Sequence, residues 1–153
     1  MTQFMGTHIN RLDAKGRVSI PAPFRAALRP ADAAARGRLI LRPSHKQLAI
    51  EGWPPAAFDA LEAPMQRLDV FSDEQDDLAF TLYAEAAEVD PDGDGRIVLP
   101  AELISHAGLA GNVAFVGLGR KFEIWAPAAL ERRRAEARMR TLARGLTLPG
   151  SGA

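Results

Sequence analysis

Two similar five-residue turns carry the side chains of this chain that are best suited to binding a charged partner. The first is Asp-Ala-Lys-Gly-Arg, from Asp13 to Arg17, and the second is Asp-Gly-Asp-Gly-Arg, from Asp92 to Arg96. The aspartate of such a turn can accept backbone N–H hydrogen bonds, and its glycine permits a positive φ. The arginine can offer its planar guanidinium to a phosphate or to guanine. A nucleic-acid contact, a purely structural turn and a solvated basic surface are the alternatives that this pattern leaves open.

Further hydrogen-bond donors lie around the first turn. Lys15 and Arg17 alternate along an extended segment, so their side chains share one face of it. Other donors precede the turn or lie on the segment that follows it, namely His8, Asn10, Arg11, Arg25 and Arg29. In the second turn Asp94 stands where the first has Lys15, which predicts a weaker contact with a phosphate there.

The two turns belong to an internal repeat. Each is followed by three mostly apolar residues and then by Pro-Ala, 79 residues apart. Three later segments also correspond in the same order: 37–41 with 111–115, 48–50 with 122–124, and 55–58 with 127–130. Internal repeats dictate architecture, and two units of about 75 residues are each marginal alone. We therefore expect two copies of one small unit that share a core.

Local patterns predict the same elements in both copies. Prolines after short β-prone segments start helices, Gly-rich stretches form turns, and Ser72 to Gln75 is a capping box. The expected strands are 18–20, 38–41, 47–51, 97–99, 113–117 and 121–125, and the expected helices are 21–28, 54–61, 73–84, 100–107 and 127–144. The fold class is therefore mixed α+β and β-rich. The expected organisation is a first repeat at 1–68, a linking helix at 69–86, a second repeat with a C-terminal helix at 87–145, and a flexible tail at 146–153.

Charge is strongly segregated although the formal net charge is zero. Residues 1–46 contain nine Lys/Arg and two Asp, and residues 95–153 contain nine Lys/Arg and four Glu. Residues 47–94 contain one Arg and thirteen Asp/Glu. Such asymmetry indicates a polyanionic partner or acidic–basic contacts between subunits. For the arginine-rich last helix, an acidic patch on a neighbouring subunit is favoured over nucleic acid.

Catalytic and metal-binding patterns find little support. The chain has no cysteine, its three histidines lack ligand spacing, and no serine lies in a nucleophile elbow. Residues 90–97 match the first half of an EF-hand loop, but Ala101 stands where the bidentate acid is required. We expect no enzyme activity, no cofactor, no metal and no small-molecule substrate. No apolar run approaches the ~20 residues of a membrane span and no signal peptide is evident, which predicts a cytoplasmic protein.

The repeated turns resemble the MraZ family of bacterial regulators, within the wider AbrB-like, swapped-hairpin group. The resemblance covers about residues 4–140. It rests on the turn at 13–17 with Pro-Ala-Pro-Phe-Arg at 21–25, on 92–100, and on Phe-Glu-Ile-Trp at 122–125. It implies two tandem swapped-hairpin units that form a pseudo-twofold barrel flanked by helices. It also implies a nucleoid-associated ring oligomer that binds direct repeats in double-stranded DNA upstream of its own gene and the division and cell-wall cluster.

The resemblance assigns DNA contacts to Lys15 and Arg17, and then to Arg96. With the nearby donors, the predicted DNA-binding residues are Arg11, Lys15, Arg17, Arg25 and Arg96, and the predicted turn-forming residues are Asp13, Gly16, Asp92 and Gly95. Two alternatives are an oligomeric protein-interaction or scaffold module and an AbrB-like antitoxin. The antitoxin is disfavoured because the turn is doubled and the tail is short.

Overall fold

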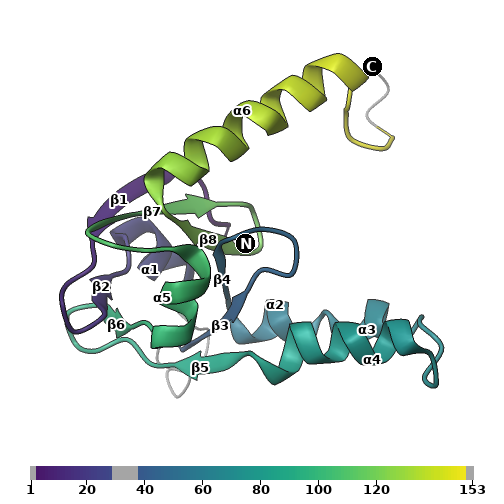
Figure 1. Cartoon of the computed structure of the whole chain (residues 1–153), viewed down its shortest axis with the longest axis horizontal. Coiled ribbons are helices and arrows are strands. Elements are labelled where there is room, and N and C mark those ends of the chain that lie inside the picture. Colours follow the sequence, from purple (N-terminus) through teal and green to yellow (C-terminus); the bar gives the residue numbers. More distant parts are fainter. Residues whose placement is uncertain (1–2, 29–37, 151–153) are drawn as a thin grey trace.

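The structure is a computed structural model and describes residues 3–28 and 38–150 (Figure 1). Its elements follow the order expected of two repeats, with an added set of helices between them. In chain order they are β1 (Thr7–Arg11), β2 (Arg17–Ser19), α1 (Ala22–Leu28), β3 (Leu39–Pro43), β4 (Ile50–Trp53), α2 (Pro55–Asp59), α3 (Glu62–Met65), α4 (Asp73–Ala79), η2 (Phe80–Ala84), β5 (Ala87–Val89), β6 (Arg96–Val98), α5 (Ala101–Ala107), β7 (Asn112–Gly117), β8 (Phe122–Trp125) and α6 (Pro127–Arg144).

The strands of the two repeats interleave in one antiparallel sheet of order β1-β7-β8-β4-β3-β5. The first strand of each repeat pairs with the hairpin of the other: β1 with β7, and β5 with β3. Between the two hairpins, β4 pairs with β8 and sets Glu51 opposite Glu123. The order of strands is therefore the same from either edge inward, as a pseudo-twofold relation between the repeats requires.

A separate ribbon of two short antiparallel strands, β2 and β6, also joins the repeats. Val18 faces Ile97 at its centre, Arg17 faces Val98, and Ser19 faces Arg96. Arg17 corresponds to Arg96 in the repeat, and Ser19 corresponds to Val98. The two outer pairs are therefore equivalent, and the ribbon has pseudo-twofold symmetry about its central pair. Val18 and Ile97 are each 1% exposed, which places the inner face of the ribbon in the core.

Aromatic rings fill the centre of that core. Phe4, Phe24, Phe115 and Phe122 contact one another with ring centroids 5.3–6.3 Å apart. The shared core supports the expectation that neither repeat buries enough apolar surface alone.

Several sequence predictions need correction. Among the described strands the sheet does not close into the expected barrel, because β1 and β5 remain its edges. The strand expected at 47–51 lies instead at Ile50–Trp53, since the Ser44 hydroxyl accepts N–H bonds from Lys46 and Gln47 and extends the turn. The helix expected at 54–61 ends at Asp59, and the one expected at 73–84 becomes π-helical from Phe80 onward.

Other predictions are confirmed. Helix α6 spans 127–144 as expected, and α5 ends at Ala107 before Gly108, which adopts a left-handed conformation. Ser72 caps α4 as expected, since its hydroxyl accepts the Gln75 N–H at 3.1 Å. The second bond of a capping box is replaced, because the Ser72 N–H donates to Asp69 O at 2.9 Å. Across residues 3–28 and 38–150, no helix is both long enough and apolar enough to cross a membrane.

Candidate nucleic-acid interface

The first turn is organised by one carboxylate. Asp13 Oδ1 accepts the backbone N–H groups of Lys15 at 2.9 Å and Arg17 at 2.8 Å, and Asp13 Oδ2 accepts Arg17 Nε at 2.8 Å. Gly16 has a φ of +80°, which favours glycine at this position. The Arg17 N–H and then the Arg17 guanidinium lower the pKa of Asp13, so the carboxylate stays ionised at neutral pH.

The second turn repeats this geometry. Asp92 accepts the N–H groups of Asp94 at 2.9 Å and Arg96 at 3.0 Å, and Arg96 Nε at 3.0 Å. Gly95 has a φ of +78°. The Arg96 N–H lowers the pKa of Asp92, as the equivalent group does in the first turn. The two turns therefore share one hydrogen-bonding pattern and one backbone conformation at their glycines.

The two turns differ in what remains free on the arginine. Asp94 Oδ2 lies 3.2 Å from Arg96 Nη2 and engages one terminal nitrogen of that guanidinium. Neither Nη group of Arg17 has a partner in the described part of the chain, because Lys15 stands where the second turn has Asp94. The first turn thus presents a guanidinium that Asp13 orients through Nε and whose outer nitrogens remain open.

Both arginines lie on the exposed face of the β2–β6 ribbon. Residues opposite one another or two apart along a strand share a face, so Arg17, Ser19, Arg96 and Val98 lie together while Val18 and Ile97 face inward. Arg17 and Arg96 are diagonal neighbours, roughly 7–8 Å apart between Cα atoms. Val98 is 58% exposed, so an apolar side chain lies beside the two arginines on this face. Sequence reasoning missed Ser19 and Val98, although strand alternation places each two residues from an arginine.

Each turn is supported by the other repeat. The Leu99 N–H donates to Gly16 O at 2.8 Å, and the Ile20 N–H donates to Gly95 O at 2.9 Å. A Cβ on Gly16 would contact Ile104 at 3.5 Å, and a Cβ on Gly95 would lie 2.4 Å from Arg25 Cδ. The supporting side chains, Ile104 and Arg25, are themselves equivalent in the repeat. The two turns therefore form one interlocked unit.

Several of the other predicted hydrogen-bond donors contact the protein itself. Arg25 Nη1 donates to Ile20 O at 3.2 Å and approaches Asp94 O at 3.5 Å, so Arg25 braces the second turn from the first repeat. Asn10 Nδ2 donates to Ser19 O at 2.6 Å and links β1 to β2. His8 packs edge-on against Phe24. Arg11 is exposed at the end of β1, and Arg29 lies outside the described residues.

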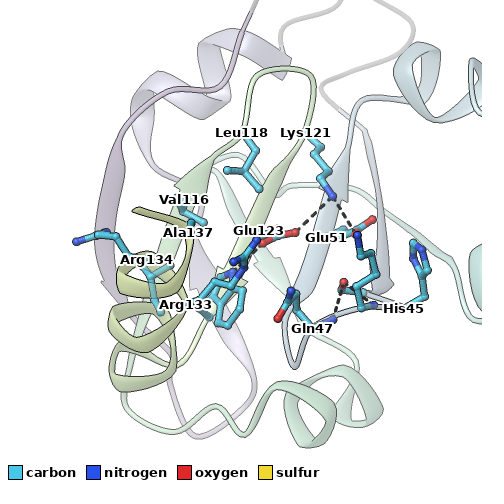
Figure 2. Close-up of a pocket in the computed structure, with 14 residues that line it drawn as sticks. His45, Gln47, Glu51, Val116, Leu118, Lys121, Glu123, Arg133, Arg134 and Ala137 are labelled. Carbon is cyan, nitrogen blue, oxygen red and sulfur yellow. Dashed lines mark hydrogen bonds and ion pairs between the residues drawn. The ribbon is translucent and has the colours of Figure 1, made fainter. Parts of the chain in front are cut away.

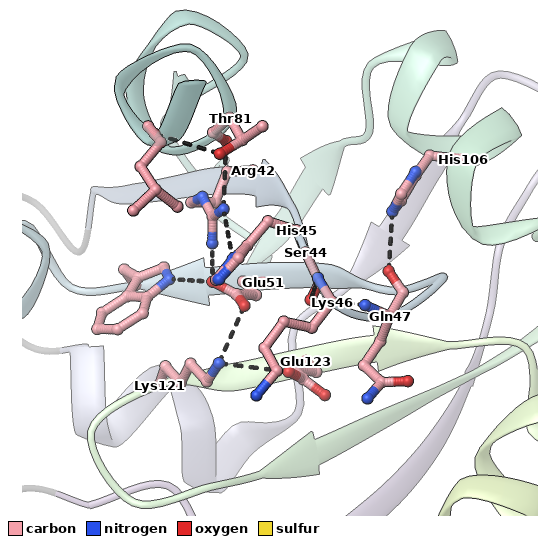
Figure 3. Close-up of polar contacts among 12 residues, drawn as sticks. Arg42, Ser44, His45, Lys46, Gln47, Glu51, Thr81, His106, Lys121 and Glu123 are labelled. Carbon is pink, nitrogen blue, oxygen red and sulfur yellow. Dashed lines mark hydrogen bonds and ion pairs between the residues drawn. The ribbon is translucent and has the colours of Figure 1, made fainter. Parts of the chain in front are cut away.

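A buried charged cluster at the junction of the repeats was missed by sequence reasoning (Figure 3). Glu51 forms an ion pair with buried Arg42, accepts Trp53 Nε1 at 2.9 Å, and accepts Lys121 Nζ at 3.0 Å. Burial raises the pKa of Glu51, but the Lys121 and Arg42 cations outweigh it and leave that pKa lowered. Lys121 also approaches Glu123 at 3.4 Å, which relieves the repulsion between two facing carboxylates.

The Glu51–Trp53 hydrogen bond has an equivalent in the second repeat. There, Glu123 Oε1 accepts a hydrogen bond from Trp125 Nε1 at 2.8 Å. Glu-x-Trp thus recurs at a spacing of 72 residues, two fewer than the sequence parallel between 48–50 and 122–124 assumes. That shared tripeptide was the signal available in the sequence. The two repeats are aligned correctly in this region when Glu51 and Trp53 are matched with Glu123 and Trp125. Matching the segment 48–50 with 122–124 shifts the alignment by two residues.

A hollow of about 390 Å³ lies beside this cluster where α6 meets the hairpins (Figure 2). Lys121 extends between Glu51 and Glu123 on one side of it, and Arg133 and Arg134 come from α6 on the other. Both glutamates are held by ion pairs and tryptophan N–H groups, so we assign the cluster a structural role. Among the described residues, no group of three or more His, Asp or Glu side chains could hold a metal ion. In particular, Asp92 is committed to Arg96.

Two interleaved repeats, each presenting an Asp-x-x-Gly-Arg turn on a shared ribbon, define a tandem-repeat protein with one composite surface that carries both turn arginines. The chain belongs to the MraZ family. The family model described as "MraZ protein, putative antitoxin-like" matches residues 3–81 and again 82–145.

Relatives support this assignment over nearly the full length. The protein named transcriptional regulator MraZ of Gluconacetobacter diazotrophicus is 62% identical over 152 residues, which cover 99% of this chain and 95% of that protein. The protein of the same name in Gluconobacter oxydans is 52% identical over 157 residues, covering 99% and 96%. That of Rhodospirillum rubrum is 38% identical over 133 residues, covering 86% and 84%.

Proposed function

We propose that this protein is a sequence-specific DNA-binding transcriptional regulator, not an enzyme, and that the β2–β6 ribbon is its DNA-reading element. The observation that carries the proposal is the exposed face of the ribbon, where both turn arginines lie beside Ser19 and Val98. The major groove of B-DNA admits a two-stranded β-ribbon. The names of the relatives agree with a role in transcription.

The ribbon offers complementary chemistry for base edges and phosphates. The open Nη groups of Arg17 suit the O6 and N7 acceptors of guanine, and exposed Val98 suits a thymine methyl group. Lys15 has no side-chain partner within the described ranges and suits a phosphate. We assign Arg96 a weaker role because Asp94 occupies one of its nitrogens. Arg11 is assigned to the backbone of the DNA, and Arg25 to positioning of the second turn as well as to added positive charge.

We further propose that several copies act together on direct repeats upstream of the gene for this protein and of the division and cell-wall cluster, in the nucleoid. Repeated modules in one assembly gain effective concentration on repeated DNA sites. The interleaved pairing of β1 with β7 and β5 with β3 supports an AbrB-like swapped-hairpin organisation. We retain 1–68, 69–86, 87–145 and 146–153 as the proposed units of the chain.

The test measures binding of the purified protein to DNA from upstream of its own gene by fluorescence anisotropy, with a scrambled duplex as control. We expect preference for the natural DNA, a log–log salt slope of several units because each neutralised phosphate contributes about 0.9, and a sharp loss of affinity when one repeat remains. Equal affinity for both duplexes would reject sequence-specific regulation. It would favour the alternative of a protein-interaction scaffold, to which the segregated charges also lend themselves.

A further inference from the structure

Two helical extensions of opposite charge leave the sheet at equivalent points of the two repeats. Pro55 begins α2 after β4, and Pro127 begins α6 after β8, at the repeat spacing of 72 residues. The first extension, which we call the acidic arm, comprises residues 55–85 and contains eight Asp/Glu and one Arg. Helix α6 contains six Arg and two Glu. Figure 1 shows both projecting beyond the sheet on the same side of the molecule, with their far ends apart.

The acidic arm is fixed to the sheet and presents one acidic face outward. Arg42 Nη2 donates to Thr81 O at 3.2 Å and anchors the arm to β3. Along α4 and into the first residue of η2, the outward residues recur at i, i+3, i+4 and i+7, which is one face of a helix: Asp73, Asp76, Asp77 and Phe80. All four are exposed, and Phe80 is 70% exposed. Within the described residues, none of these three aspartates forms an ion pair.

Helix α6 presents the complementary face. Its outward residues follow the same spacing, Ala135, Arg138, Met139 and Leu142, with Glu131 and Arg132 one turn earlier. The charge of Glu131 is offset by its ion pair with Arg134 at 3.0 Å. Met139 is 71% and Leu142 78% exposed, although apolar side chains at this spacing normally cover a neighbour. In the part of the chain that the structure describes, neither Arg132 nor Arg138 has an ion-pair partner. The helix is about 27 Å long, so this face offers several turns of contact.

We propose that the outer face of α6 in one copy packs along the outer face of α4 in a second copy, with Arg132 and Arg138 on the aspartates and Met139 and Leu142 around Phe80. The proposal deepens the self-association within the proposed function and does not depend on DNA binding. Each copy carries one basic and one acidic face at different places, so the contact is head-to-tail. Such heterologous contacts propagate and close into a ring when the rotation permits. DNA is the less suitable occupant, because it leaves the apolar residues of both faces uncovered.

Charge reversal tests the pairing in the absence of DNA. The first variant combines Arg132→Glu with Arg138→Glu, and the second combines Asp76→Lys with Asp77→Lys. We expect each alone to lose the mass of the wild-type assembly in light scattering, and an equimolar mixture to recover it, because both kinds of contact are then restored. The matched controls are Arg140→Glu with Arg144→Glu, and Glu74→Lys with Glu85→Lys, which change charge equally off these faces and should keep the wild-type mass. A monomeric wild type, unchanged mass in either variant, or no recovery on mixing overturns the proposal.

Cysteine cross-linking gives a readout that does not depend on how reversed charges affect folding. The chain has no native cysteine, so Phe80→Cys combined with Met139→Cys places the only two thiols on the two faces. Oxidation of the assembled protein should yield a ladder of covalent oligomers on a denaturing gel, whereas either cysteine alone should leave monomer. Phe80→Cys with Arg140→Cys, on the other side of α6, should give at least tenfold less ladder. A dimer from either single variant would show a symmetric contact, and absence of the ladder would show no contact; both overturn the proposal.

Discussion

Replacing Asp94 by lysine should strengthen DNA binding, because it gives the second turn the same charged residues as the first. The substitution removes the 3.2 Å pair between Asp94 Oδ2 and Arg96 Nη2, frees that nitrogen, and adds a cation at the position equivalent to Lys15. One new charge-assisted contact contributes about 1.5 kcal/mol or more, which corresponds to about a tenfold lower Kd per engaged turn. The backbone of the turn should be unaffected, because Asp92 and not Asp94 accepts its N–H groups.

The salt dependence separates a new phosphate contact from a general gain of charge. One further phosphate contact steepens the log–log slope by about 0.9, so a rise from 50 to 200 mM salt should weaken the variant about 3.5-fold more than the wild type. The assay is fluorescence anisotropy on the upstream DNA at four salt concentrations. Glu85→Lys makes the same change of charge on the acidic arm and serves as the control, and Lys15→Asp should weaken binding. If Asp94→Lys binds DNA no more tightly than Glu85→Lys does, the conclusion that Asp94 weakens the contact of Arg96 with DNA is wrong.

Four other outcomes are expected. Arg17→Ala should lose about 1–3 kcal/mol of specific binding per engaged turn in the same assay while circular dichroism stays unchanged; retained affinity would exclude its open Nη groups as the contact. Asp13→Ala should also weaken binding although it removes a negative charge, because Arg17 loses its anchor; a gain in affinity would contradict this. Gly52→Ala should lower the free energy of unfolding in urea by about 1–3 kcal/mol, since the added Cβ would lie 2.2 Å from the Phe122 ring. An unchanged urea midpoint of unfolding would show that the ring moves aside freely. The pKa of Glu51 is lowered from 4.5 in the folded protein, so ionised Glu51 stabilises the fold above that pH, and this stabilisation is lost as pH falls through the folded pKa. Glu51→Gln should therefore destabilise the protein at pH 7 and reduce the fall of its melting temperature below pH 4.5. An equally steep fall in the variant would show that other groups cause the acid sensitivity.

The sequence allowed prediction of features that depend on short-range chemistry. Asp13, Gly16 and Arg17 form their turn through contacts within five residues, so the pattern of residue types was sufficient. The helix starts at Ser72 and Pro127 follow from local capping and proline geometry for the same reason.

Features that depend on residues far apart in the chain could not be predicted in this way. The bracing role of Arg25 requires the second turn, 69 residues away, to pack against α1. The open sheet depends on how the repeats interleave, including the pairing of β4 with β8. Buried Arg42 resembles a surface residue in the sequence until Glu51 and Thr81 are placed beside it.

The interleaved sheet has a consequence for synthesis of the chain on the ribosome. When the first repeat emerges from the ribosome, the partner strands of β3 and β1 have not yet been synthesised. Strand β3 pairs with β5, and Thr7 of β1 pairs with Val116 of β7. Contacts so distant in sequence slow folding, and unpaired strand edges during that interval favour aggregation. The first repeat is therefore an incomplete nascent species and not an early-folding domain. A premature stop between the repeats also disturbs the first turn, because Gly16 O then lacks the hydrogen bond that it accepts from the Leu99 N–H of the second repeat.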